Sequence, residues 1–307
     1  MKQCWKKLGQ IYCPATAGRH PKLVTHAANP LPILLEGDIY RIFFCGRDAS
    51  NRSSIGAVDI DIVSRTVVRD HFEPIFEYGP PGSFYADGVS IGGCYTVSGL
   101  QYMLFMGWQT PLGGQFRGDI GRLVLDTDLG LTLESNSPFL GSDPTDPISL
   151  SYPWVTTDDE GNYLMLYGST LTWDAGNGEM LHVIHLATSV NGHDWARKGA
   201  AVPHSLGIAQ AFSRPTVART ENGGYQMWFS YRGPNTKYRI GYAESADGHL
   251  WRLDLENAGI DVSASGWDSE MIEYPCVFDH LGVRYMLYNG NSYGKTGFGL
   301  AVMAGER

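Results

Sequence analysis

The chain of 307 residues has a globular composition, with 43% hydrophobic and 18% charged residues, and carries a formal net charge of −9. This length suffices for one large domain or two ordinary ones with a substantial core. The negative charge argues against a general affinity for nucleic acid or anionic membranes, and no apolar run is long enough to span a bilayer. We therefore expect no nucleic-acid partner and no membrane partner.

Taken in chain order, the sequence predicts short strands joined by turns, in a pattern that recurs about every 60 residues. Each repeat is anchored by an aromatic-rich strand with alternating apolar residues, which is typical of β structure. These predicted strands are 39–48 (IYRIFFCGRD), 101–109 (QYMLFMGWQ), 162–170 (NYLMLYGST), 224–233 (GYQMWFSYRG) and 284–293 (RYMLYNGNSY). Their anchoring tyrosines are Tyr40, Tyr102, Tyr163, Tyr225 and Tyr285.

Further strands are predicted on either side of each anchor. In four repeats a first strand contains a proline ten residues before the anchoring tyrosine: Pro30, Pro153, Pro215 and Pro275. A third strand follows each anchor, at 53–60, 118–125, 182–189, 238–245 and 297–302. Most repeats then have room for a fourth strand, but the last one does not, so we expect segment 4–13 (CWKKLGQIYC) to supply it. The sequence therefore predicts a single all-β domain over residues 1–307, a five-bladed β-propeller closed by its N-terminal strand.

The cysteines and the N-terminal segment bear on the compartment. The cysteines are scattered and odd in number, and none has the spacing of a zinc site: Cys4, Cys13, Cys45, Cys94 and Cys276. Buried free thiols in a reducing compartment account for them best. The N-terminal segment has basic residues but lacks the apolar core of a signal peptide. We therefore predict a cytoplasmic protein with no cofactor and no metal.

A polar ring is predicted where the first strands meet. In a propeller the first strand of each blade lines the central channel as a sheet edge, where proline is tolerated. In four repeats the proline and the residue before it indicate which residue pair lies at the mouth of the channel. The second repeat lacks this proline, and there the Asp-Gly turn is taken as the equivalent position. The expected pairs are Ala28-Asn29, Ala86-Asp87, Ser151-Tyr152, Ser213-Arg214 and Glu273-Tyr274. A convergent polar ring in a cavity indicates a binding or catalytic site.

Loops that follow the anchor strands are predicted to enlarge this ring. They contribute Arg47, Asp48, Trp108, Gln109, Trp173, Arg232, Asn289, Asn291 and Lys295. Aromatic rings stack on the apolar face of a sugar, while amides and guanidinium groups bind its hydroxyls. Together with Tyr152, Arg214 and Tyr274, these side chains are predicted to bind an oligosaccharide or a sugar conjugate.

At the level of the blades, nearly the whole chain resembles the five-bladed propeller glycosidases of glycoside hydrolase families 43, 32, 62 and 68. The stretch 40–61 (YRIFFCGRDASNRSSIGAVDID) is similar to the mannoside phosphorylases and hydrolases of family 130. The resemblance implies acid and base carboxylates at the central channel, and Asp87 matches the acidic position of the second blade. Asn29 and Ser151-Tyr152 stand where many members carry acids.

The catalytic prediction takes Asp87 as base or nucleophile, Glu273 as general acid and Asp48 as a third acid. Two carboxylates in different surroundings across one channel acquire different pKa values, as acid and base catalysis on a glycosidic bond requires. For each acid the alternative is a salt bridge to a neighbouring arginine that only stabilises the channel.

The nature of the reaction stays open at this point. Arg47, Arg214, Arg232 and Lys295 map to the same face, where they either neutralise the acids or hold phosphate or a phosphosugar. The family 130 resemblance implies the second role. Three functions therefore remain: hydrolysis of a glycosidic bond, phosphorolysis or glycosyl transfer, and sugar binding without turnover.

Overall fold

The computed structural model describes residues 3–15 and 17–304, in which strands dominate and consecutive strands pair as antiparallel meanders. The first meander is β2 (Thr25–Glu36), β3 (Ile39–Arg47), β4 (Ser53–Asp61) and β5 (Thr66–Phe76). The second is β6 (Gly88–Val97), β7 (Leu100–Gln109), β8 (Arg117–Leu125) and β9 (Leu131–Leu133). The third is β10 (Ser149–Thr157), β11 (Tyr163–Thr172), β12 (Leu181–Ser189) and β13 (Ala196–Ala200). The fourth is β14 (Ala211–Arg219), β15 (Tyr225–Arg232), β16 (Arg239–Ser245) and β17 (Arg252–Leu253).

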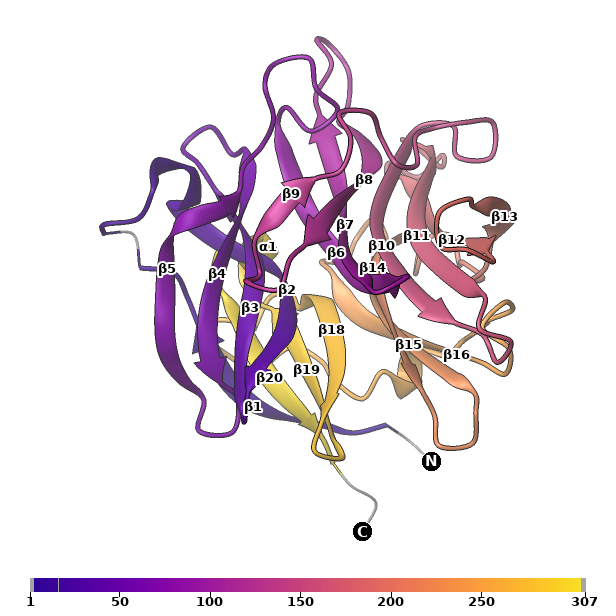
Figure 1. Cartoon of the computed structure of the whole chain (residues 1–307). Coiled ribbons are helices and arrows are strands. Elements are labelled where there is room, and N and C mark those ends of the chain that lie inside the picture. The colour runs from indigo at the N-terminus through magenta and orange to yellow at the C-terminus, as the bar shows by residue number, and fades with distance from the viewer. Residues whose placement is uncertain (1–2, 16, 305–307) are drawn as a thin grey trace.

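The last meander joins the two ends of the described chain. It consists of β18 (Glu273–His280), β19 (Val283–Asn289), β20 (Phe298–Met303) and β1 (Trp5–Tyr12), with β1 antiparallel to β20. Figure 1 shows the indigo β1 lying beside the yellow β20. Short helical turns complete the described elements: η1 (Pro21–Leu23), η2 (Leu255–Asn257) and α1 (Asn291–Gly294). The all-β prediction is confirmed, and so is the prediction that the N-terminal strand completes the last sheet.

The first strands of the meanders surround a common centre (Figure 1). Strand β2 contacts β6, β6 contacts β10, β10 contacts β14, β14 contacts β18, and β18 returns to β2. Buried apolar side chains fill the space between neighbouring sheets, as where Trp5 of β1 packs edge-on against Trp228 of β15 with ring centroids 5.4 Å apart. The inner strands therefore bring together residues that are far apart in the sequence.

A bulge interrupts each of these first strands at the same place. The register shifts lie between Ala28/Leu31, Ile91/Cys94, Ser151/Trp154, Ser213/Thr216 and Glu273/Cys276. In four strands the residue before the proline has a positive φ between 40° and 54°: Asn29, Tyr152, Arg214 and Tyr274. Such a φ is uncommon for residues with a Cβ, and a bulge redirects the side chains around it. The prolines lie within first strands, as predicted, and each bulge turns its pre-proline residue.

Closure of the last sheet depends on one glycine. Gly297 has φ +81°, and a Cβ there would lie 2.0 Å from the carbonyl oxygen of Tyr12 at the end of β1. We expect Gly297→Ala to lower the free energy of unfolding by about 2–4 kcal/mol, through backbone strain and overpacking. Gly282→Ala is the control, because Gly282 has a similar φ of +77° with open space around its Cβ position. Equal losses in the two variants, measured by denaturant unfolding, would contradict a specific role in closure.

The cysteines differ from the prediction in part. Cys45 and Cys276 are buried and Cys94 is half-buried, but Cys4 and Cys13 are exposed because they flank the ends of β1. The prediction of buried thiols is therefore wrong for the last two. All five are free thiols in the described chain, 3–15 and 17–304.

Candidate functional site

A cavity of about 340 Å³ opens where the inner strands meet the loops of the adjoining strands. It lies over β6, β10, β14 and β18, and its wall also includes residues from the ends of β3, β7, β12 and β15. Its lining residues are Arg47, Ser90, Met106, Trp108, Phe116, Ser151, Tyr152, Met180, His182, Ser213, Arg232, Tyr238, Tyr274 and Tyr293. The predicted site residues Arg47, Trp108, Tyr152, Arg232 and Tyr274 are thus brought together.

Glu273 begins β18, next to the lining residue Tyr274, and is completely buried. Neither carboxyl oxygen has a hydrogen-bond partner among the described residues. Burial raises the pKa of this carboxyl well above its usual range, and the charges of Arg47 and Arg232 oppose the rise. A buried acid without a partner is costly, so this group is poised to hold a proton and to interact with something that enters the cavity.

Aromatic rings form much of the cavity wall. The bulges direct Tyr152 and Tyr274 toward one another, with hydroxyl oxygens 3.4 Å and ring centroids 5.4 Å apart. The Trp108 indole Nε1 donates to Ser53 Oγ at 3.1 Å, which fixes the ring at the end of β7. Trp173 does not line the cavity itself but packs edge-on against the lining residue Phe116 at 4.9 Å. This wall offers flat apolar faces with hydroxyl groups at their edges.

Serine and histidine side chains supply polar groups between the aromatic rings. His182 Nε2 lies 2.7 Å from Ser151 Oγ, and its Nδ1 lies 2.7 Å from Thr170 Oγ1. Burial, reinforced by His185 and Arg232, lowers the pKa of His182 to about 3, so the ring is neutral near pH 7. Ser213 Oγ, by contrast, has no hydrogen-bond partner within the described residues. A molecule bound in the cavity can therefore satisfy the Ser213 hydroxyl.

One wall of the cavity is an ion pair. Arg232 contacts both carboxylate oxygens of Glu179, Nε to Oε2 at 2.8 Å and Nη2 to Oε1 at 3.0 Å. Its Nη1 also donates to the hydroxyl of Tyr293 at 3.4 Å, and its guanidinium lies over the Tyr238 ring. These contacts hold Arg232 in place at the rim.

Arg214 is buried and does not line the cavity. Its guanidinium donates to four carbonyl oxygens at the bulges of two other inner strands: Tyr274 and Pro275 of β18, and Asn29 and Pro30 of β2. The distances range from 2.8 to 3.5 Å. Arg214 was predicted to bind substrate, but its donors are used to bridge the inner strands, which is a structural role.

Like Glu273, the two predicted catalytic aspartates are not among the residues that line the cavity. Asp87 immediately precedes β6, and its Oδ2 accepts a hydrogen bond from the backbone N–H of Thr110 at 2.6 Å. Asp48 accepts bonds from the backbone N–H groups of Ser50 and Arg52 and pairs with the Arg52 guanidinium at 2.9 Å. The Asp48 carboxylate therefore organises its own loop, and the Asp87 carboxylate ties the start of β6 to the loop after β7.

The ring pair predicted for the second repeat is wrong. The bulge of β6 falls after Ile91, so Ile91-Gly92 stands where the other strands carry Glu273-Tyr274 or Ser151-Tyr152. Glycine is required there because a Cβ on Gly92 would lie 2.3 Å from the carbonyl oxygen of Pro153 in β10. The Asp-Gly turn at Asp87 was mistaken for the bulge, which displaced the alignment by five residues.

The remaining predicted residues have varied surroundings. Asn289 is buried and bonds the backbone of Ala27, Asn29 and Gly297, while Asn291 bonds that of Gly266, Glu270 and Met271. The amides of both asparagines therefore stabilise loops. Gln109 is half-buried at the end of β7, and Lys295 is exposed on the loop after α1.

Several lining residues were not assigned to the site from the sequence: Ser90, Met106, Phe116, Met180, His182 and Tyr238. The sequence did contain a signal for His182 and Tyr238, namely their positions at the starts of predicted third strands. His182 lies at the start of β12 and Tyr238 directly before β16, and third strands begin on the face where anchor strands end. Extending the predicted ring to the first residues of the third strands would have included both.

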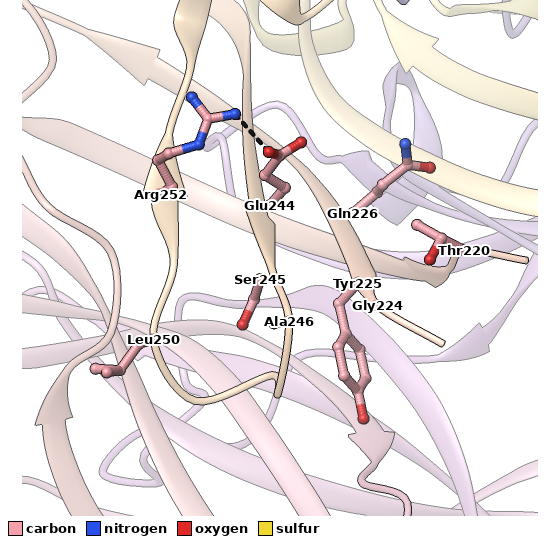
Figure 2. Close-up of a pocket in the computed structure, with 9 residues that line it drawn as sticks. All are labelled: Thr220, Gly224, Tyr225, Gln226, Glu244, Ser245, Ala246, Leu250 and Arg252. Atoms are coloured by element: carbon pink, nitrogen blue, oxygen red, sulfur yellow. Dashed lines mark hydrogen bonds and ion pairs between the residues drawn. The ribbon is translucent and has the colours of Figure 1, made fainter. Parts of the chain in front are cut away.

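A second hollow lies at the outer side of the fourth meander and is shown in Figure 2. Tyr225, Gln226 and Leu250 contribute to its wall, and Arg252 pairs with Glu244 across it. The Arg252 and Glu244 side chains are exposed, and this hollow shares no lining residue with the first cavity.

The described residues contain neither a cluster of metal-binding side chains nor a membrane-spanning helix. No group of three or more His, Cys, Asp and Glu side chains that could hold a metal ion occurs within 3–15 and 17–304. In the same residues, no helix has the length and apolar character needed to cross a bilayer.

Comparison with known proteins gives relatives in sequence and in structure. No protein-family model matches the chain. It is 44% identical over 301 residues to "Uncharacterized protein MT1551" and to "Uncharacterized protein Rv1502", from two strains of Mycobacterium tuberculosis, covering 97% of this chain and 99% of each relative.

Similar solved structures are β-propeller glycoside hydrolases. One titled "Glycoside hydrolase" has a TM-score of 0.73 at 14% identity, covering 98% of this chain and 91% of its own. The α-L-arabinofuranosidase PaAbf62A from Podospora anserina, in complex with cellotriose, has a TM-score of 0.71 at 10% identity, covering 99% and 98%. An exo-1,5-α-L-arabinanase from a bovine ruminal metagenomic library has a TM-score of 0.62 at 15% identity, covering 91% and 92%. These likenesses show a shared fold.

Proposed function

Because the chain belongs to the same family as the Mycobacterium tuberculosis protein Rv1502 and has the fold of the β-propeller glycoside hydrolases, we propose that it is a carbohydrate-active enzyme acting on a glycosidic bond. The observation that carries this proposal is Glu273, a fully buried carboxyl without a partner beside a cavity of aromatic rings and hydroxyls. A carboxyl whose pKa is raised above its usual range is suited to protonate a leaving glycosidic oxygen.

In this proposal most of the residues at the cavity bind the sugar and one carboxyl group supplies a proton. Tyr152, Tyr274 and Trp108 would stack on the sugar, and Ser213 and Ser151 would bond its hydroxyls. Glu273 would donate a proton to the glycosidic oxygen as the bond from that oxygen to the anomeric carbon breaks. The anomeric carbon then bonds to water, which releases a proton to solvent, or to phosphate. Asp87 bonds the backbone of Thr110 and Asp48 pairs with Arg52, so the proposal gives them no reacting role.

Phosphorolysis is the second candidate, and a specific observation favours it. Glycoside hydrolysis ordinarily uses two carboxyl groups, one of which activates water or attacks the sugar. Among the described residues, Glu273 is the one carboxyl beside this cavity that is free of partners, since Glu179 pairs with Arg232. If phosphate is the attacking group, a single acid on the protein is enough.

We also propose the number of blades and the extent of the domain. We take the meanders to be the five blades of one propeller domain over residues 1–307, as the closed cycle of contacts between first strands supports. The free thiols support action in a reducing compartment such as the cytoplasm, on an oligosaccharide or a sugar conjugate.

The test is a screen of oligosaccharides and aryl glycosides with and without inorganic phosphate, with released sugar and sugar 1-phosphate as readouts. Release that does not need phosphate indicates hydrolysis, and phosphate-dependent sugar 1-phosphate indicates phosphorolysis. Binding by calorimetry without any turnover would contradict an enzymatic function and favour a sugar-binding protein.

The location of binding can be checked with exposed side chains, whose replacement should leave the fold intact. Tyr293→Ala removes a ring at the cavity rim and is expected to weaken sugar binding by about tenfold, or ~1.4 kcal/mol. Leu250→Ala in the second hollow is the control and should leave binding unchanged.

A further inference from the structure

Two positive side chains, Arg47 in the cavity lining and Lys295 on a neighbouring loop, have no carboxylate partner among the described residues. Arg47 lines the cavity, and its guanidinium donates to the side-chain oxygen of Asn51 at 2.6 Å. Lys295 is exposed on the loop after α1. Within the described parts of the chain, neither side chain forms an ion pair.

Arg47 and Lys295 converge on one short stretch of β2. Arg47 pairs with Thr25 across the β2–β3 ladder, directly beside His26. The loop that carries Lys295 packs on the same strand. The backbone of Gly294 approaches Ala28 so closely that a Cβ added at Gly294 would lie 3.0 Å from the Cα of Ala28. Burial, together with the charges of Arg47 and Lys295, lowers the pKa of His26 to about 4, so its ring is neutral near pH 7. The two cations are thus neighbours with a neutral imidazole beside them.

The acids around the cavity do not offset this charge. Glu179 is bound by Arg232, and Asp48 is bound by Arg52. Burial raises the pKa of Glu273, which favours its neutral form. An excess of positive charge at one opening is unusual in a chain whose net charge is −9.

We propose that Arg47 and Lys295 bind an anionic substituent of the sugar, a carboxylate or a phosphate ester, so that the enzyme selects acidic sugars. The inference rests on the proposed function in one respect, that a sugar occupies this cavity. A guanidinium group binds two oxygens of such an anion at once, while an ammonium group adds a point charge with freely oriented donors. Arg47 and Lys295 would therefore determine specificity and would not take part in the bond cleavage.

The experiment is calorimetric titration of matched acidic and neutral sugars in phosphate-free buffer of low ionic strength. The pairs are methyl glucuronide and methyl glucoside, methyl galacturonide and methyl galactoside, and mannose 6-phosphate and mannose, with inorganic phosphate alone as a further probe. At least one acidic sugar is expected to bind about 10–100-fold more tightly than its neutral counterpart. Preference within the first two pairs identifies a carboxylate, and preference within the third identifies a phosphate ester.

The variants Arg47→Gln and Lys295→Gln should each weaken binding of the acidic sugar by about tenfold, and Lys295→Gln should leave the neutral sugar unaffected. Lys198→Gln, which removes an exposed charge from the outer strand β13, is the matched control and should change neither.

Three results would overturn the inference. They are equal affinity within every pair, a preference that survives in both variants, and inorganic phosphate binding as tightly as the phosphosugar. Since binding is measured without turnover, acidic sugars that bind through Arg47 and Lys295 but are never cleaved would support the inference while refuting the proposed chemistry.

Discussion

The Glu273→Gln variant is expected to lose about 10²–10⁴-fold in turnover of a glycoside that the wild type cleaves, because an amide cannot supply the proton that the leaving oxygen needs. The loss should depend on the leaving group. A dinitrophenyl glycoside leaves without protonation and should lose far less than an alkyl glycoside. Steady-state rates of wild type and variant on these two substrates give the comparison.

The same substitution is expected to stabilise the protein at neutral pH. Because the pKa of Glu273 is raised in the folded protein, there is a pH range above the usual carboxyl pKa in which the unfolded chain has lost this proton and the folded chain still holds it. The free energy of unfolding therefore falls as the pH rises through this window. Glutamine does not ionise, so the melting temperature of the variant should exceed that of the wild type by about 2 °C or more near pH 8, and the gap should shrink toward pH 4.

Glu244→Gln is the control for both effects, because it makes the same chemical change at an exposed ion pair in the second hollow (Figure 2). It should leave turnover unchanged and should not reproduce the pH-dependent gap in melting temperature. Equal loss of turnover on the alkyl and dinitrophenyl substrates would refute Glu273 as proton donor. A Glu273→Gln variant less stable than the wild type at pH 8 would refute the account of its buried carboxyl.

The architecture could be predicted from the sequence because each meander repeats the same local signals. The tyrosine-anchored strands, the turns after them and the missing fourth strand of the last repeat were enough to expect β1 beside β20. Pairing within a meander is local in sequence, and the strand pattern alternates with a period of two. The meanders lie against one another because each of these similar units must bury both faces of its sheet.

The candidate site could be predicted only where its residues follow the repeat. Tyr152 and Tyr274 line the cavity and Glu273 lies directly beside Tyr274, at bulges that a proline marks in the sequence. In β6 the bulge is formed by Gly92 and Gly93 without a proline, so alignment by proline and Asp-Gly turn selected Ala86-Asp87 in place of Ile91-Gly92. The roles of Arg47, Arg232 and Arg214 depended on side-chain direction across the channel, which the repeat pattern does not encode.

Arg214→Met is expected to be the most destabilising single change discussed here, with a loss of about 3–5 kcal/mol in the free energy of unfolding. The inner strands are sheet edges, and their bulges leave carbonyl oxygens of β18 and β2 without ladder partners. The buried guanidinium of Arg214 satisfies four of these oxygens, and methionine fills a similar volume but donates nothing. An unsatisfied buried carbonyl costs about 1–3 kcal/mol, so the loss of several at once is large.

Thermal unfolding should show this as a fall of order 10 °C in melting temperature. Arg252→Met is the control, since Arg252 is exposed in its pair with Glu244, and its melting temperature should stay at the wild-type value. Arg214→Lys separates charge from geometry, because an ammonium group cannot reach oxygens on both strands in the plane that a guanidinium spans. If Arg214→Lys and Arg214→Met are equally unstable, the planar fork is the essential feature. If Arg214→Met melts at the wild-type temperature while sugar binding is lost, Arg214 serves the ligand and its structural role is refuted.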